Sequence, residues 1–193
     1  EKGINAVFEY PVLVPMQEDR LVAVKHLNPV MIAAAYGHVS LLKRLLEDEE
    51  YAPYINLQHL DSTKSSVLHH AIRGKDPEGC MALLMRQDPL SPAALAQISS
   101  KSVSTKKLTQ AMISQTDELG YMAAHYLVCR NTAFPKVRSK MAEELRDLCA
   151  LDTAITGMAP QGKDQAPSLA KHPVGCTMLH IAVTKRHVDY IKV

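Results

Sequence analysis

The sequence predicts an all-α chain built from repeated pairs of short helices. The clearest pair covers residues 28–46, where Pro29 stands in the first turn of one helix and Gly37 ends it. The second helix of the pair carries apolar side chains at helical spacing, namely Leu41, Leu42, Leu45 and Leu46. Two helices of this size cannot bury a core by themselves, so the pair has to recur along the chain.

The pattern of this pair recurs three times. Asn28-Pro29-Val30-Met31-x-Ala33-Ala34-x-x-Gly37-His38 is followed by Ser66-Val67-Leu68-His69-x-Ala71-Ile72, Met122-Ala123-Ala124-His125-x-Leu127-Val128 and Thr177-Met178-Leu179-His180-x-Ala182-Val183. These residues resemble the ankyrin signature, in which a Thr-Pro-Leu-His opening precedes two alanines and a Gly-His turn. The resemblance implies an ankyrin-repeat solenoid of helix-turn-helix units with helical insertions.

The four copies divide the chain into unequal units. They open at positions 28, 66, 122 and 177, so the steps are 38, 56 and 55 residues, against about 33 in ankyrin proteins. The extra residues predict a helical insertion over 88–116 and a loop insertion over 152–171. The predicted units are repeat 1 (28–60), repeat 2 (61–87), repeat 3 (117–151) and a truncated repeat 4 (172–193). In repeat 2, Asp76 and Pro77 replace the Gly-His turn and open the second helix.

The first 27 residues fit no copy. Pro11 and Pro15 exclude a regular helix over 7–15, so we expect an extended segment there. A short helix is expected over 16–27, through Leu21, Val22 and Val24. This region is either an N-terminal cap of the first repeat or the tail of an upstream domain.

Composition narrows the class of protein. No apolar run reaches the roughly 18 residues of a membrane helix, and a net charge of +2 gives no indication of nucleic-acid binding. The four cysteines show neither disulfide-framework spacing nor a metal-binding pair, which predicts reduced thiols in the cytoplasm. We expect a monomer without cofactor or metal.

The recurring histidines are predicted to be structural. In ankyrin proteins this histidine forms a hydrogen bond around the turn before the helix, close to the residue three positions earlier. Ser66 and Thr177 keep a hydroxyl at that place, whereas His125 follows Met122 and has to find another partner. Motifs for phosphate binding, a serine nucleophile or a zinc protease are absent from the sequence, so we expect no enzyme here. A Cys129 nucleophile with His125 is the alternative.

The resemblance also implies a binding surface. Positions that vary between ankyrin proteins face the concave side of the solenoid, and here they include five aromatic or basic residues: Tyr36, Arg73, Tyr121, Arg130 and Lys185. Tyrosine and arginine commonly anchor interfaces. We therefore expect a protein or peptide partner of acidic character on this face. The alternative is that these charges are simply solvated.

Three functional classes remain open from the sequence. The first is a protein-interaction scaffold. The second is a substrate-recruiting ankyrin region of a larger enzyme, whose catalytic domain lies outside this chain. The third is an effector of the bacterial type, which would act in the host cytosol. The last rests on analogy, because such effectors have irregular, heavily inserted repeats.

Overall fold

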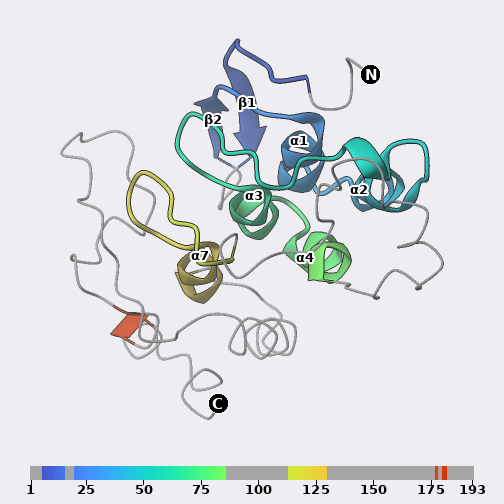
Figure 1. Cartoon of the computed structure of the whole chain (residues 1–193). Helices are drawn as coiled ribbons and strands as arrows, with labels where there is room; N and C mark the ends of the chain where they lie inside the picture. Colours follow the sequence, from blue (N-terminus) through green and yellow to red (C-terminus); the bar gives the residue numbers. More distant parts are fainter. Residues whose placement is uncertain (1–5, 16–19, 86–112, 130–176, 178–179, 182–193) are drawn as a thin grey trace.

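The computed structural model describes residues 6–15, 20–85, 113–129, 177 and 180–181 (Figure 1). The elements in chain order are β1 (Val12–Pro15), β2 (Leu21–Val24), α1 (Pro29–Ala35), α2 (Val39–Glu47), the 3-10 helix η2 (Ala52–Tyr54), α3 (Val67–Arg73), α4 (Pro77–Met85) and α7 (Ala123–Cys129). Four parts of the prediction fall wholly or largely outside the described residues: the insertion at 88–116 apart from residues 113–116, the insertion at 152–171, the second helix of repeat 3 and nearly all of repeat 4.

The prediction of an all-α ankyrin solenoid is wrong. The described part has five short α-helices together with an antiparallel sheet of two strands, in which Val12 pairs with Val24 and Pro15 with Leu21. The prediction of a short helix over 16–27 is also wrong, because Leu21–Val24 forms the second strand. β-Branched valines favour a pleated, half-buried surface, and Pro15 stands at the end of its strand, where a missing N–H matters least.

The sheet buries part of one face: Val22, on the same face as its partner Val14, is 40% exposed, and Pro15 on the other face is buried. Val14 and Val24 are completely buried, whereas Leu13 and Leu21 on the opposite face are 53% and 57% exposed. β1 contacts α1, and the Tyr36 hydroxyl at the end of α1 donates a hydrogen bond to the Leu13 carbonyl oxygen. The N-terminal hairpin therefore lies against the first helix pair.

The first helix pair forms as predicted. Asn28 is the N-cap of α1 and its Oδ1 accepts a hydrogen bond from the Met31 N–H at 2.9 Å. Gly37 then adopts a left-handed φ of 69°, which reverses the chain before α2. The second pair also begins as predicted, because Pro77 opens α4 and the Asp76 Oδ1 accepts from the Gly79 N–H at 2.9 Å.

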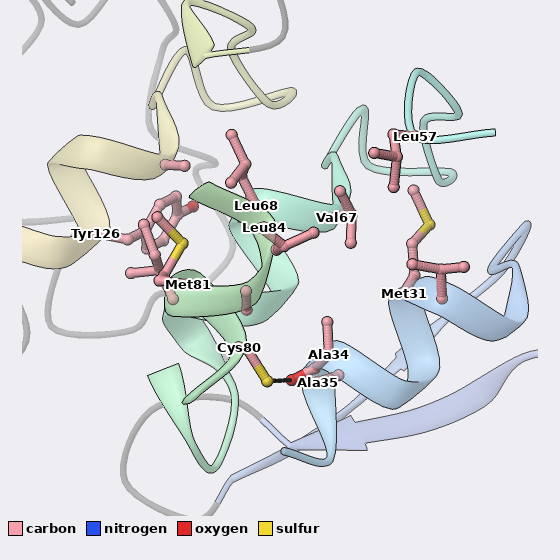
Figure 2. Close-up of a cluster of buried hydrophobic side chains, with 14 of the residues drawn as sticks. Met31, Ala34, Ala35, Leu57, Val67, Leu68, Cys80, Met81, Leu84 and Tyr126 are labelled. Carbon is pink, nitrogen blue, oxygen red and sulfur yellow. Dashed lines mark hydrogen bonds between the residues drawn. The ribbon is translucent and has the colours of Figure 1, made fainter. Parts of the chain in front are cut away.

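The helices stack in two rows, and the core lies between them (Figure 2). α1 packs against α3, α3 packs against α7, and α2 packs against α4 (Figure 1). The core includes Ala34 and Ala35 of α1, whose small side chains allow α3 and α4 to approach closely. The Cys80 thiol donates to the Ala34 carbonyl oxygen at 3.6 Å, so this buried free cysteine links the two pairs.

Backbone hydrogen bonds also join the loops that precede the helix pairs. The bonds run from Phe8 N to Leu27 O at 2.9 Å, from Ser62 N to Lys25 O at 3.0 Å and from Glu118 N to Thr63 O at 2.8 Å. The N-terminal segment and the three loops thus form one continuous row. Among the described residues, none of the helices has both the length and the apolar character needed to cross a bilayer.

Gly74, directly after α3, lies where the backbones of α1 and α3 approach each other closely. A substitution there tests this approach. A Cβ at this position would lie 2.6 Å from the Ala35 carbonyl oxygen and 2.7 Å from that of Ala34. Because both contacts are with backbone, neither can move aside easily. We expect Gly74→Ala to lower the free energy of unfolding by about 1–3 kcal/mol, as overpacking generally does, in urea-induced unfolding.

The control for this variant is Ser40→Ala, which also introduces alanine but adds no atom, at an exposed position of α2. It should leave the free energy of unfolding within about 0.5 kcal/mol of the parent. Equal stability of Gly74→Ala and Ser40→Ala would contradict the close approach of α1 and α3.

Candidate functional site

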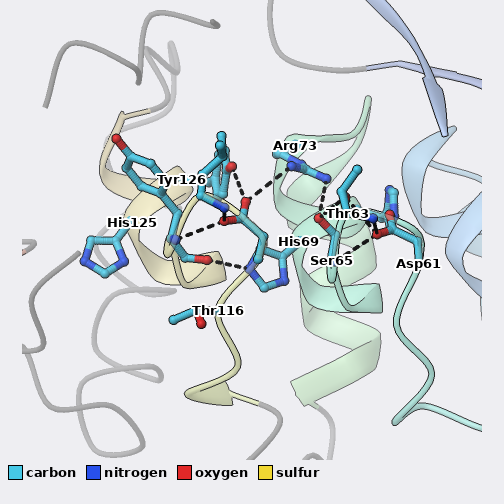
Figure 3. Close-up of polar contacts among 12 residues, drawn as sticks. Asp61, Thr63, Ser65, His69, Arg73, Thr116, His125 and Tyr126 are labelled. Atoms are coloured by element: carbon cyan, nitrogen blue, oxygen red, sulfur yellow. Dashed lines mark hydrogen bonds and ion pairs between the residues drawn. The ribbon is translucent and has the colours of Figure 1, made fainter. Parts of the chain in front are cut away.

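Polar side chains, all buried except the half-buried Thr63, gather between α3 and α7 (Figure 3). They come from the loop before α3, from α3 itself, from the loop before α7 and from α7. The members of this polar cluster are Asp61, Thr63, Ser65, His69, His70, Arg73, Asp117 and Tyr126.

Asp61 organises the loop before α3. Its Oδ1 accepts hydrogen bonds from the Thr63 N–H at 2.7 Å, the Thr63 hydroxyl at 2.7 Å and the Ser65 N–H at 2.9 Å. Its Oδ2 lies 2.7 Å from His70 Nε2. A carboxylate only accepts, so the Nε2 of His70 carries the proton and donates it. Asp61 thereby fastens the loop to the helix that follows.

Asp117 repeats this arrangement before α7. Its Oδ1 accepts from the Leu119 and Tyr121 N–H groups, both at 3.0 Å. Its Oδ2 accepts a short hydrogen bond from the Tyr126 hydroxyl. In both loops the carboxylate binds the N–H groups two and four residues later and a side chain nine residues later. The two loops are therefore built on one plan.

Arg73 joins the two loops. One end nitrogen, Nη2, donates to Ser65 Oγ at 3.0 Å, and the other, Nη1, lies 3.9 Å from Asp117 Oδ2. The guanidinium carbon also lies 4.8 Å from the centroid of the Tyr126 ring. Since the Thr63 hydroxyl donates to Asp61, the Ser65 hydroxyl donates to Thr63 Oγ1 at 2.9 Å. A chain of hydrogen bonds thus runs from Arg73 to Asp61, and a direct ion pair runs from Arg73 to Asp117.

The three recurring histidines bond at the start of their helices, as predicted. Each Nδ1 accepts from the backbone N–H three residues earlier: Ser66 to His69 at 3.1 Å, Met122 to His125 at 3.0 Å and Thr177 to His180 at 3.2 Å. The hydroxyls of Ser66 and Thr177 add a second bond, at 2.9 and 2.8 Å. His125, which has no hydroxyl to accept from, uses the backbone N–H of Met122.

His69 also connects the second helix pair with α7. Because its Nδ1 accepts from Ser66, the proton is on Nε2, which donates to the Tyr121 carbonyl oxygen at 2.9 Å. Burial and the nearby Arg73 charge lower the pKa of His69 to about 3. The neutral form with the proton on Nε2 is thus the one that both hydrogen bonds require.

The charges in the polar cluster are set by burial and by these hydrogen bonds. Burial alone would raise the pKa of Asp61, but the hydrogen bonds from His70, Thr63 and Ser65 together lower it. Burial lowers the pKa of His70, although the hydrogen bond that His70 donates to Asp61 acts to raise it. Burial raises the pKa of Asp117, because its hydrogen bonds and the Arg73 charge offset only part of the desolvation.

The contacts of the polar cluster give it a structural role. In the part of the chain that the structure describes, no three His, Cys, Asp or Glu side chains are grouped to hold a metal ion. Burial raises the pKa of the Cys80 thiol to about 12, which keeps it in the unreactive protonated form. Apart from Arg73 Nε, the buried side-chain polar atoms that the structure describes form hydrogen bonds within the protein.

The structure places three of the five predicted binding residues. Tyr36 is half-buried, stacks on His38 with ring centroids 5.9 Å apart and holds the hairpin through Leu13. Arg73 and Tyr121 are only 7% and 2% exposed, and both lie in or beside the polar cluster. Neither presents a free side chain to a partner. Arg130 and Lys185 lie outside the described residues, so their role stays a prediction.

The sequence analysis missed the two loop aspartates and their helix partners. A signal was present: an aspartate stands five residues before the opening residue of two copies, at Asp61 and Asp117. A polar side chain follows the recurring histidine in the same two copies, at His70 and Tyr126. The pairing of these features could have indicated the loop-to-helix hydrogen bonds.

Comparison with known proteins identifies no family for this chain. No protein-family model matches it, and no curated protein is similar to it. The assignment of its role therefore rests on the residues and contacts described above.

The two hydrogen bonds of His69 can be separated by substitution. Asn places its oxygen near the position of Nδ1, so His69→Asn keeps an acceptor for Ser66 and loses the donor to Tyr121. His69→Gln reaches the position of Nε2, so it keeps that donor and loses the acceptor. We expect each variant to lose about 1–3 kcal/mol in the free energy of unfolding, as for one unmade buried hydrogen bond.

The matched control is Ser66→Ala, which removes the hydroxyl and keeps the backbone N–H that donates to His69. Its cost should be smaller than that of either His69 variant in the same chemical denaturation measurement. A Ser66→Ala variant less stable than both would show that the hydroxyl, rather than the histidine, caps α3.

The same histidines predict how stability depends on pH. Unfolded histidine takes up a proton near pH 6.5, whereas folded His69 does so only near 3 and folded His70 below its usual value. Between these limits the unfolded state binds more protons, so the free energy of unfolding falls as the pH is lowered. Each histidine contributes a slope of up to about 1.4 kcal/mol per pH unit. Asp117 opposes this trend, because its folded pKa is raised.

Urea unfolding at a series of pH values checks this expectation. The slope should be shallower in His69→Asn, because that variant lacks one of the titrating groups. An unchanged slope would show that His69 is not the source of the acid sensitivity.

Proposed function

We propose that this chain is a protein-interaction module that binds a partner protein or peptide. The observation that carries the proposal is the outer face of the N-terminal hairpin. Leu13 and Leu21 are more than half exposed there, on the opposite side of the sheet from the buried Val14 and Val24. An antiparallel sheet that faces water on one side normally has polar side chains on that side.

The exposed apolar side chains gather at this end of the described structure. Its exposed large apolar residues are Val7, Phe8, Tyr10, Leu13, Leu21, Val22, Leu41 and Tyr54, of which all but the last two belong to the N-terminal segment and the hairpin. Single exposed apolar residues need no explanation, whereas a cluster of them is typical of an interaction site. We call the outer side of Leu13 and Leu21 the hairpin face.

The polar cluster supports binding rather than chemistry. Its carboxylates and histidines are buried and bonded to one another, so they serve the stacking of the helix pairs. A rigid stack of this kind holds surface side chains in fixed relative positions. Such preorganisation favours binding because little order has to be imposed when the partner arrives.

Kinship with ankyrin repeats stays a prediction. The three capping histidines and the packing of α1 against α3 support it. The β-hairpin and the absence of a matching family model do not.

The experiment compares the parent chain with a Leu13→Ser/Leu21→Ser variant. Partners are captured from cell lysate and identified, and their affinity is then measured with purified proteins. The variant should melt like the parent, because both side chains are exposed, and should bind the partner at least about tenfold more weakly, which corresponds to about 1.4 kcal/mol.

Leu41→Ser is the matched control, since it removes an exposed leucine from α2, away from the hairpin face. It should bind like the parent. Equal affinity of all three proteins for every confirmed partner would exclude the hairpin face, and the absence of any partner would contradict the proposed function itself.

A further inference from the structure

The loops before the helix pairs share a left-handed position. It lies two residues before the residue that opens each helix, and φ there is 61° at His26, 58° at Lys64 and 78° at Gly120. The sequence has Gly175 at the same place before Thr177. Glycine suits such a position because it has no Cβ. Two of the four copies nevertheless have a basic residue there.

These two residues reduce the stability of their loops. A left-handed backbone places Cβ too close to the following carbonyl oxygen, and only glycine, or at times a short polar residue, adopts it readily. Lysine has a Cβ, and its side chain is long. The side chains of His26 and Lys64 are exposed and form no hydrogen bond or ion pair with any residue in the described ranges. Contacts within the described protein therefore do not offset the strain.

The two positions lie in neighbouring loops. Ser62 N donates to the Lys25 carbonyl oxygen at 3.0 Å, and Lys25 N donates to Ser62 Oγ at 3.2 Å. This pairing brings His26 and Lys64, together with the exposed Lys25, to one edge of the molecule. His59 Nε2, in the second loop, lies 2.6 Å from the carbonyl oxygen of His26 and so supports its backbone.

The basic side chains at this edge form no ion pair with any described residue. Asp61 lies in the same loop as Lys64, but it is buried and already accepts four hydrogen bonds. Glu118 is an exposed acidic residue of the loop before α7. Its backbone N–H donates to the Thr63 carbonyl oxygen. Glu9, next to Phe8, is a second exposed acidic residue near this edge, but in the described part of the chain neither Glu9 nor Glu118 forms an ion pair with Lys25, His26 or Lys64.

We propose that Lys25, His26 and Lys64 form a recognition edge for an acidic, extended segment of a partner protein. The proposal rests on the proposed function and specifies the chemistry of the partner. Its particular claim is that His26 and Lys64 occupy glycine-type positions because their side chains bind the partner. The partner's carboxylates would supply the charge partners that the fold itself does not provide.

The edge adjoins the N-terminal segment that leads into β1. His26 N donates to the Phe8 carbonyl oxygen at 2.7 Å, so the half-exposed Phe8 directly adjoins the basic residues. An extended segment that alternates acidic and apolar side chains would contact both surfaces. A nucleic acid fits less well, because the chain has a net charge of only +2 and the adjoining surface is apolar.

The test uses a His26→Gly/Lys64→Gly variant of the full chain. Because glycine removes the strain, the variant should melt a few degrees higher than the parent. Binding is measured by fluorescence polarisation with a labelled peptide in which Glu alternates with Val. The parent should bind this peptide, more weakly at higher salt, and the variant should bind at least about tenfold more weakly. A peptide with Lys in place of Glu should not bind.

Two further variants separate strain from charge. Lys64→Asn removes the charge and keeps a residue that tolerates the left-handed backbone, so it should weaken binding with little loss of stability. Lys43→Gln removes an exposed positive charge from α2 and should leave peptide binding unchanged.

The inference is overturned if the Glu peptide does not bind the parent, if it binds parent and glycine variant equally, or if the glycine variant is less stable than the parent. These failures are distinct from failure of the proposed function. A partner that depends on Leu13 and Leu21 and still binds the glycine variant would preserve the module and reject this edge. The absence of any partner would reject both.

Discussion

The stacking of the helix pairs depends on two buried carboxylates, Asp61 and Asp117. A buried carboxylate costs several kcal/mol of desolvation unless its lone pairs are used. Here backbone N–H groups occupy one oxygen and a helix side chain the other, so the course of each loop is set by the need to satisfy one charge. Arg73 then bonds to both loops. Removing any of these groups would leave another buried and unsatisfied, which explains why the network couples α3 to α7.

The sequence predicted local features better than their assembly. Pro29, Gly37 and Pro77 define helix ends through backbone properties that act within a few residues, and the structure has α1, α2 and α4 where these residues require them. The capping histidines were predictable for the same reason. The strand at Leu21–Val24 was not, because its four apolar residues fit a helix or a strand equally well. Only the pairing with Val12–Pro15 decides between the two.

The polar cluster was harder to predict because it joins residues far apart in the chain. Arg73 and Tyr121 were expected on an exposed face from their position within a repeat. In the structure α7, whose sequence begins fifty residues after α3 ends, packs against α3 and encloses both side chains. The bond from His69 to Tyr121 spans 52 residues. A position within one unit cannot show which of its faces the next unit covers.

The features of the molecule that oppose stability lie at one end. A fold optimised for stability alone would have polar side chains on the outer side of β1 and β2 and glycine at positions 26 and 64. This chain instead exposes Leu13 and Leu21 and strains His26 and Lys64. The bonds from Phe8 to Leu27 and from Lys25 to Ser62 bring these departures together. Both costs arise in the N-terminal segment, the hairpin and the loops that they contact, which is the region where we propose that a partner binds.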